Sequence, residues 1–130
     1  MKTARISSII DLTEGGCNAC GIIKCESYTL TMDGLETPLE ELTVSTLVMT
    51  LALKSGFKQE MKMALLDDYI SFTKGDLEVK LFEDYDRLTY KSAAAEMNTR
   101  DRIADTQELT ETANNILTTL FQIEAIAFEY

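Results

Sequence analysis

The chain of 130 residues contains no histidine and no tryptophan, and it has a single proline. Histidine is the commonest general base near neutral pH, and no motif supplies a lysine or carboxylate partner for a serine or cysteine nucleophile. Glycine-rich phosphate loops of the GxGxxG or GxxxxGK[ST] type are missing as well. We therefore expect a protein that is not an enzyme.

Long apolar runs are also missing. No stretch approaches the ~18 apolar residues that a membrane-spanning helix needs. The apolar stretch near the N-terminus is too short and too broken for a signal peptide. There is no low-complexity segment, no linker and no internal repeat. We expect one domain over residues 1–130, without a membrane contact and located in the cytoplasm.

Basic residues are scarce relative to acidic ones. Twelve lysines and arginines stand against 22 aspartates and glutamates, which gives a formal charge of −10. Such a surface repels nucleic acid and anionic membranes, because phosphate binding depends on neutralisation by lysine and arginine. The charge serves either solubility alone or an acidic face for a basic protein partner, such as one that itself binds nucleic acid.

The first third of the chain predicts two strands and a helix. Residues 4–12 and 22–32 are rich in β-branched residues, and turn signals follow both. Thr37, Pro38 and Glu40 have the spacing of a capping box with proline at the first helical position. Apolar residues then recur at three- and four-residue intervals, so we expect a buried helix near residues 38–54.

The middle of the chain predicts a meander of strands. Residues 57–66 fit both a helix and a strand, and the alternation of their methionines with polar residues favours a strand. Residues 69–73 and 77–82 alternate on either side of a Lys-Gly turn, which is typical of a hairpin with one solvated face. We expect residues 87–91 to add an edge strand and residues 92–104 to form a helical turn and a loop.

The last segment predicts a second helix. Asp105 and Glu108 form a cap pair, and one apolar seam follows to the chain end, so we expect a long helix near residues 105–129. Strands and helices come in blocks, which indicates an α+β fold. We expect a mainly antiparallel sheet, made of the N-terminal strand pair plus the meander, with both helices on one face. The apolar stripes of these helices also favour a homodimer.

All three cysteines lie in one short stretch, at Cys17, Cys20 and Cys25. The CNACG segment is similar to half of a zinc-ribbon or rubredoxin-type site, so the three thiols are candidate zinc ligands. An extended strand of ~3.3 Å per residue would carry Cys25 away from Cys20. Completion of the site would therefore need a second chain or one of the nearby carboxylates of Asp11, Glu14 and Glu26.

Two other interpretations of the cysteines remain. A thioredoxin-like role is the weaker one, because a strand rather than a helix follows the motif. The other is free thiols in a hairpin turn, which the odd number of cysteines favours over a disulfide between Cys17 and Cys20 because it indicates reducing conditions.

A dense acidic segment follows the predicted hairpin, at Glu83, Asp84, Tyr85 and Asp86. It is either a solvated turn or a binding site for a basic partner, with Tyr85 as the aromatic anchor.

Two classes of function therefore fit this chain. The first is a small acidic regulator, inhibitor or chaperone-like factor that works without a cofactor by occupying a basic protein partner. In size, acidity and α+β composition the chain is similar to the dimeric secretion chaperones of bacteria, although it lacks their usual N-terminal helix. The second is a zinc-binding or redox module built on the cysteine segment. The charge and the missing catalytic groups favour the first.

Overall fold

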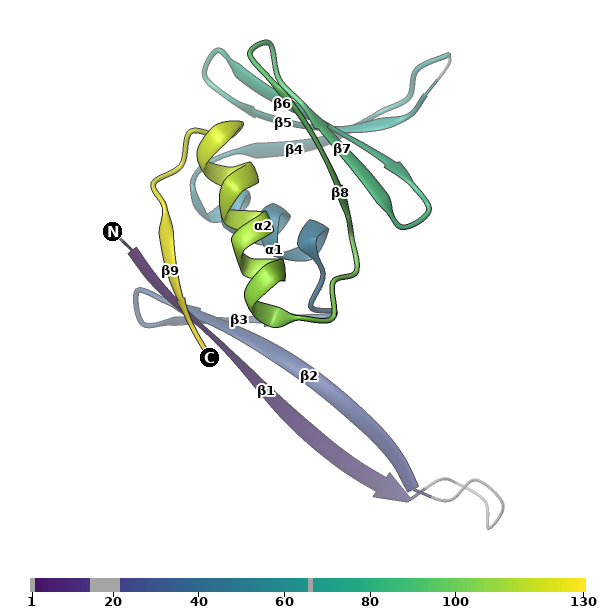
Figure 1. The fold of residues 1–130 in the computed structure, drawn as a ribbon, viewed down its shortest axis with the longest axis vertical. Helices are drawn as coiled ribbons and strands as arrows, with labels where there is room; N and C mark the ends of the chain where they lie inside the picture. The colour runs from purple at the N-terminus through teal and green to yellow at the C-terminus, as the bar shows by residue number, and fades with distance from the viewer. Residues whose placement is uncertain (1, 15–21, 66) are drawn as a thin grey trace. The chain divides into compact units, whose positions relative to one another are not determined.

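The computed structural model describes residues 2–14, 22–65 and 67–130, with side chains omitted for residues 9–14 and 22–26. This part of the chain forms nine strands and two helices, which confirms the α+β class (Figure 1). It divides into two compact units, one of residues 43–125 and one of residues 2–42 with 126–130. A single domain stays a prediction.

The unit of residues 43–125 contains a five-stranded antiparallel meander. Its strands follow one another in chain order, so each hairpin connection joins neighbours. The strands are β4 (Lys58–Lys62), β5 (Tyr69–Lys74), β6 (Leu77–Asp84), β7 (Arg87–Lys91) and β8 (Glu96–Arg100). The two helices, α1 (Val44–Lys54) and α2 (Thr106–Thr119), lie on one face of this sheet, as the sequence predicts (Figure 1).

Period-two alternation sorts the meander side chains onto two faces. Phe72, Val79, Leu81, Leu88 and Tyr90 are almost fully buried, and the strand register places them on the same face. The helices contribute a matching set of buried residues: Leu47, Val48, Leu51, Ala52, Leu109, Ala113, Ile116 and Leu117.

Phe121, just beyond α2, packs in this core against three other rings. Its ring centroid lies 5.1 Å from that of Phe57, 5.5 Å from that of Phe72 and 6.4 Å from that of Tyr90, all with edge-on geometry. This aromatic cluster joins the segment after α1, two strands and the segment after α2.

The other unit is a separate four-stranded sheet, so the prediction that the N-terminal strand pair joins the meander in one sheet was wrong. β1 (Lys2–Glu14) lies between β2 (Ile22–Met32) and β9 (Ile126–Glu129), and β3 (Leu35–Leu39) pairs with the outer side of β2. The turn between β2 and β3 has positive φ at Asp33 and Gly34, as the Asp-Gly turn signal predicts. One face of the sheet is apolar, because buried Ala4 and Ile6 stand directly opposite buried Met32 and Leu30.

The prediction of a helix from residue 38 was wrong, because residues 35–39 form β3. β3 is an edge strand, where a proline such as Pro38 is tolerated because its missing N–H costs no internal ladder bond. Helix α1 begins at Val44 instead, and Thr43 is its N-cap. Thr43 Oγ1 accepts the N–H of Thr46 at 3.3 Å.

Asp101 completes the N-terminus of α1 from far along the chain. Its carbonyl accepts the N–H of Val44 at 2.9 Å, and its Oδ1 accepts the N–H of Ser45 at 2.8 Å. Thr43 and Asp101 thus satisfy N–H groups that a helix N-terminus leaves without intrahelical partners.

The second helix begins where the sequence predicts, with Asp105 as N-cap to the N–H groups of Gln107 and Glu108. The prediction that it continues to residue 129 was wrong, because α2 ends at Thr119. Gln122 has a φ of 55°, a left-handed conformation that turns the chain. Ile126–Glu129 then forms β9 and pairs in parallel with β1.

Two predictions about the meander also need correction. β7 (Arg87–Lys91) is an internal strand rather than an edge strand, because β8 pairs with its far side. β8 (Glu96–Arg100) replaces much of the helical turn and loop expected over residues 92–104. The strand preferred for residues 57–66 is confirmed for Lys58–Lys62. No helix in the described chain has the length and hydropathy needed to cross a membrane.

Candidate functional site

The acidic segment predicted as a binding site is the hairpin between β6 and β7. Glu83 and Asp84 end β6, and Tyr85 and Asp86 form the turn. Tyr85 has a φ of 56° and a fully exposed side chain. The tight turn therefore presents an aromatic ring to solvent beside exposed carboxylates.

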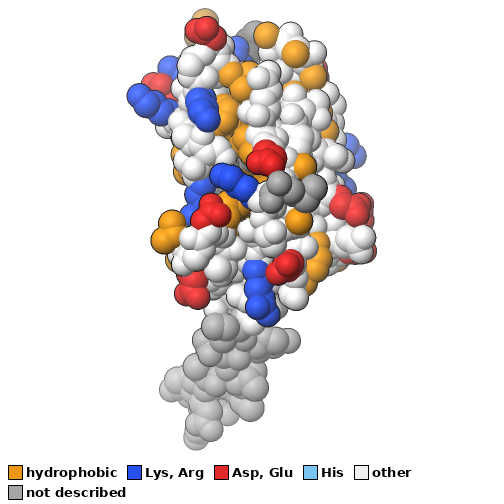
Figure 2. Space-filling model, turned by 90° about the vertical axis from the view of Figure 1, so that its left-hand side faces the viewer, with side chains coloured by type: hydrophobic (Ala, Val, Ile, Leu, Met, Phe, Trp, Pro, Cys, Tyr) orange, Lys and Arg blue, Asp and Glu red, His pale blue; other side chains and the backbone are white. Residues whose placement is uncertain are grey.

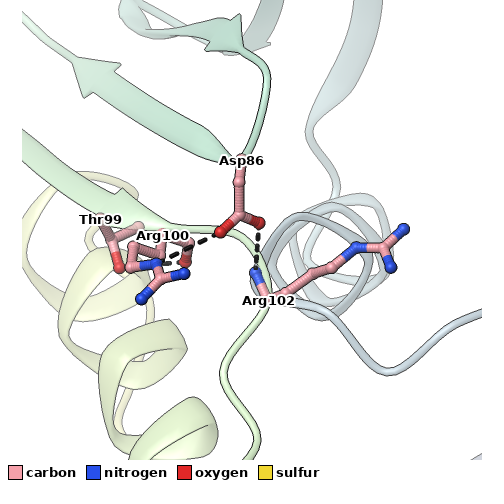
Figure 3. Close-up of polar contacts among 4 residues, drawn as sticks. All are labelled: Asp86, Thr99, Arg100 and Arg102. Carbon is pink, nitrogen blue, oxygen red and sulfur yellow. Dashed lines mark hydrogen bonds and ion pairs between the residues drawn. The ribbon is translucent and has the colours of Figure 1, made fainter.

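Asp86 differs from its neighbours because the fold uses both of its carboxylate oxygens. Its Oδ2 accepts Nε of Arg100 at 3.2 Å, and its Oδ1 accepts the backbone N–H of Arg102 at 3.1 Å (Figure 3). The carbonyl of Asp86 also accepts the N–H of Asp101 at 2.7 Å. Asp86 therefore ties the hairpin to the end of β8, next to the residue that caps α1, and it is less available to a partner than Asp84.

A groove of about 530 Å³ lies beside this hairpin. Acidic residues dominate its lining, with five carboxylates against two cationic side chains. The lining consists of Asp67, Asp68, Glu83, Asp84 and Glu96, of Arg87 and Lys91, and of Phe82 and Thr89. None of the five carboxylates forms an ion pair with another described residue, since the three described pairs belong to Glu60, Glu78 and Asp86. The groove therefore has an excess of negative charge.

Phe82 supplies the groove with an aromatic surface. It lies on the face of the sheet opposite the helices and packs against Tyr69 on the neighbouring strand, with ring centroids 5.2 Å apart. Lys91 Nζ lies 5.2 Å from the centroid of Phe82, and Lys80 Nζ lies 5.1 Å from that of Tyr69. The two rings already accept cations over their faces, as cation–π geometry requires.

A second groove of about 630 Å³ adjoins the first, since Phe82 and Lys91 line both. Its charges balance, because Asp76 and Glu78 face Lys80 and Lys91. Of these two grooves, only the one beside the β6–β7 hairpin has an excess of negative charge. On the face seen in Figure 2, acidic, basic and hydrophobic side chains are interspersed, with no single-sign field covering it.

Among the described residues, Tyr90 is the titratable side chain with the strongest perturbation of its pKa. Its side chain is fully buried, and within the described residues its hydroxyl has no hydrogen-bond partner. Burial raises the pKa of the Tyr90 hydroxyl far above its ordinary value, and the carboxylates of Asp101 and Glu83 raise it further. This phenol stays neutral, and it belongs to the core face rather than to the groove.

The three predicted metal ligands lie largely outside the part of the chain that the structure describes. Cys17 and Cys20 lie outside the described residues, and Cys25 is described only by its backbone, which pairs with that of Asp11 between β1 and β2. Among the residues that are described, no three histidine, cysteine or acidic side chains converge in a way that could hold a metal ion.

Of the four residues predicted as a binding site, only Glu83 and Asp84 line the acidic groove. The seven other lining residues are absent from the predicted site: Asp67, Asp68, Phe82, Arg87, Thr89, Lys91 and Glu96. Asp67 and Asp68 precede β5, whereas Glu96 begins β8, and only the strand register brings them near the hairpin. The alternation of β6 was the available signal for Phe82, because it assigns this residue to the face opposite buried Val79 and Leu81.

Comparison with known proteins identifies a family and no function. The chain matches, over residues 1–130, the family described as Domain of unknown function (DUF4809), and it belongs to that family. No curated protein and no solved structure matches the chain.

Proposed function

We propose that this DUF4809 protein is a non-enzymatic regulator or inhibitor that acts by occupying a basic protein partner. The acidic groove with Phe82 in its wall is the observation that carries the proposal. A basic, nucleic-acid-binding surface is the kind of partner that fits, because a cluster of carboxylates presents negative charge as phosphates do. The odd number of cysteines agrees with a reducing, cytoplasmic setting.

The chemistry of the groove suits an arginine or lysine side chain. A guanidinium group can stack on Phe82 while it pairs with a carboxylate such as that of Asp84 or Asp68. Lys91 now lies over the Phe82 ring at 5.2 Å, and a partner's cation would take its place. An incoming arginine has the advantage of a planar group that stacks and forms two hydrogen bonds at once.

The energies of these contacts imply that charge mainly affects the rate of association and the specificity of binding. Exposed ion pairs contribute about 0.2–1 kcal/mol each, and a cation–π contact at an exposed site about 0.5–1 kcal/mol. The groove alone therefore gives modest affinity, and it acts as the centre of a larger interface. The formal charge of −10 accelerates encounter with a cationic partner at low salt.

A peptide titration tests this proposal. A fluorescent arginine-rich peptide is titrated with the wild-type chain, with the double variant Asp67→Asn/Asp68→Asn, and with the control double variant Glu36→Gln/Glu40→Gln. The two variants lose the same charge, but Glu36 and Glu40 are exposed residues of the other unit. Removal of two groove carboxylates should weaken binding about 2- to 30-fold, and the control should stay close to wild type.

Two single variants separate the aromatic contribution from charge. Phe82→Leu should weaken peptide binding about 2- to 5-fold, because it removes the cation–π contact and keeps an apolar side chain against Tyr69. Lys91→Gln should strengthen binding, because it frees the ring face and removes a repelling charge. Equal weakening by the groove and control double variants would contradict the proposal, since net charge alone would then explain binding.

A further inference from the structure

β4 is an exposed edge strand that carries unusual apolar surface. Among the described strands it pairs only with β5, and Lys58, Gln59 and Glu60 are exposed to solvent. Met61 is 62% exposed, and Met63 and Leu65 just beyond it are 85% and 105% exposed. Edge strands of soluble proteins usually avoid this combination, because an unpaired backbone beside apolar side chains is a template for another strand.

We propose that β4 pairs antiparallel with β4 of a second copy, so that two meander sheets join across a two-fold axis at Met61. A two-fold axis perpendicular to the sheet keeps the faces of the two sheets continuous, so residues of the same parity stand opposite each other. When Met61 stands opposite the partner's Met61, Glu60 stands opposite the partner's Lys62, and Lys62 opposite the partner's Glu60.

Charge complementarity selects this register. Glu60 and Lys62 already form an ion pair along the strand at 3.2 Å, on the face of the sheet away from the helices. In the proposed dimer the two pairs form one four-charge cluster of alternating sign. An axis at Glu60 would instead oppose two glutamates and place Lys58 opposite Lys62, and like charges directly opposite are destabilising.

The apolar side chains favour the axis at Met61 over an axis at Gln59. An axis at Gln59 would also pair opposite charges, through Lys58 and Glu60, but it would leave Met63 beyond the paired segment. An axis at Met61 brings the two Met61 side chains together on the helix-side face and places Met63 opposite the partner's Gln59. The exposed methionines are thereby covered, and methionine adapts well to such contacts.

The helices do not offer a comparable surface. Most of the apolar residues that favoured dimerisation through the helices are buried within the single chain, and Leu53 (45%) is the one large apolar side chain of the described helices that is exposed. The buried residues are Val44, Leu47, Val48, Leu51, Ala52, Leu109, Ala113, Ile116 and Leu117. The dimer surface inferred from β4 uses none of the groove residues, so it stands independently of the proposed function.

Sedimentation equilibrium of the untagged chain under reducing conditions tests the dimer. We expect a concentration-dependent mass that approaches twice the 14.6 kDa of the monomer. Met61→Lys places two lysines on the axis and should give a monomer. Leu35→Lys is the matched control, because Leu35 is an equally exposed apolar residue (65%) on an edge strand of the other sheet.

A charge exchange tests the register itself. Glu60→Lys and Lys62→Glu should each weaken the homodimer about tenfold or more, because both cross-strand pairs become repulsive. Mixing these two single variants should restore a dimer, since each lysine then faces a glutamate. With the axis at Gln59, Lys62→Glu alone would leave the dimer intact and mixing would restore nothing.

Three results would overturn the proposal. The first is a wild-type monomer up to about 0.1 mM, which would mean a Kd too weak for a specific dimer. The second is a dimer that survives Met61→Lys and dissociates in Leu35→Lys, which would assign the contact to the other sheet. The third is a mixture of the charge variants that stays monomeric although the wild type is a dimer.

Discussion

Replacement of Tyr90 by phenylalanine should stabilise this protein. Tyr90 is fully buried, and in the described chain its hydroxyl has no hydrogen-bond partner. A buried polar group without a partner costs about 1–3 kcal/mol, whereas the ring contact with Phe121 does not depend on the hydroxyl. We therefore expect Tyr90→Phe to raise the free energy of unfolding by about 1–2 kcal/mol.

The pH dependence gives the same prediction a second readout. The folded state raises the pKa of Tyr90 above its unfolded value of 10.0, first by burial and then through Asp101 and Glu83. Above that pH the unfolded tyrosine loses its proton while the folded one keeps it, so the unfolded state gains stability. Above pH 10, the free energy of unfolding of the wild type should fall by up to about 1.4 kcal/mol per pH unit relative to that of Tyr90→Phe. Below pH 10, the difference between the two proteins should be constant.

Urea denaturation of both proteins at neutral pH and between pH 9 and 11 measures these two quantities. Tyr85→Phe is the control, because the Tyr85 side chain is fully exposed and loss of its hydroxyl should leave stability unchanged. Destabilisation of Tyr90→Phe by more than about 1 kcal/mol would refute the reasoning, because the hydroxyl would then make a favourable hydrogen bond in the folded state.

Three further substitutions test the described contacts through chemical denaturation. Asp86→Ala should lower the free energy of unfolding by about 1.5–3 kcal/mol, because it removes the acceptor of the Arg102 amide and the ion pair with Arg100. Asp84→Ala should change it by less than about 0.5 kcal/mol. Equal effects would remove the structural role given to Asp86. Phe121→Ala should cost about 3–5 kcal/mol, since it leaves a cavity among three rings, and a loss below about 1 kcal/mol would contradict that packing. Asp101→Ala should cost about 1–2 kcal/mol, and full retention of stability would show that α1 does not need its distant cap.

Local signals in this chain predict local structure well. The strand over residues 22–32, the Asp-Gly turn and the Asp105 cap each depend on neighbours in sequence, and the structure confirms all three. The segment around Pro38 was wrongly predicted as the start of a helix, because its residues are compatible with both a helix start and an edge strand. A threonine and a proline that would begin a helix also fit an edge strand, and pairing with β2 decides between them.

Distant contacts account for most of what the sequence could not predict. Asp101 caps α1 from 56 residues away, and no local pattern reveals such a partner. β9 forms because β1 offers it a parallel neighbour, although its residues continue the apolar spacing of α2. The acidic groove follows the same rule. Its contiguous part, Glu83 and Asp84, was visible in the sequence, whereas Asp67, Asp68 and Glu96 join it only through strand register.

The central claim is that the groove beside the β6–β7 hairpin is where a basic partner binds. Chemical-shift mapping of the labelled chain with an unlabelled arginine-rich peptide tests this most directly, because each backbone amide reports its own surroundings. We expect the largest shifts at the groove residues, above all at Asp68, Phe82 and Asp84, and we expect them to decrease with added salt. Shifts of equal size spread over the acidic surface, or centred on the unit of residues 2–42 with 126–130, would contradict the claim.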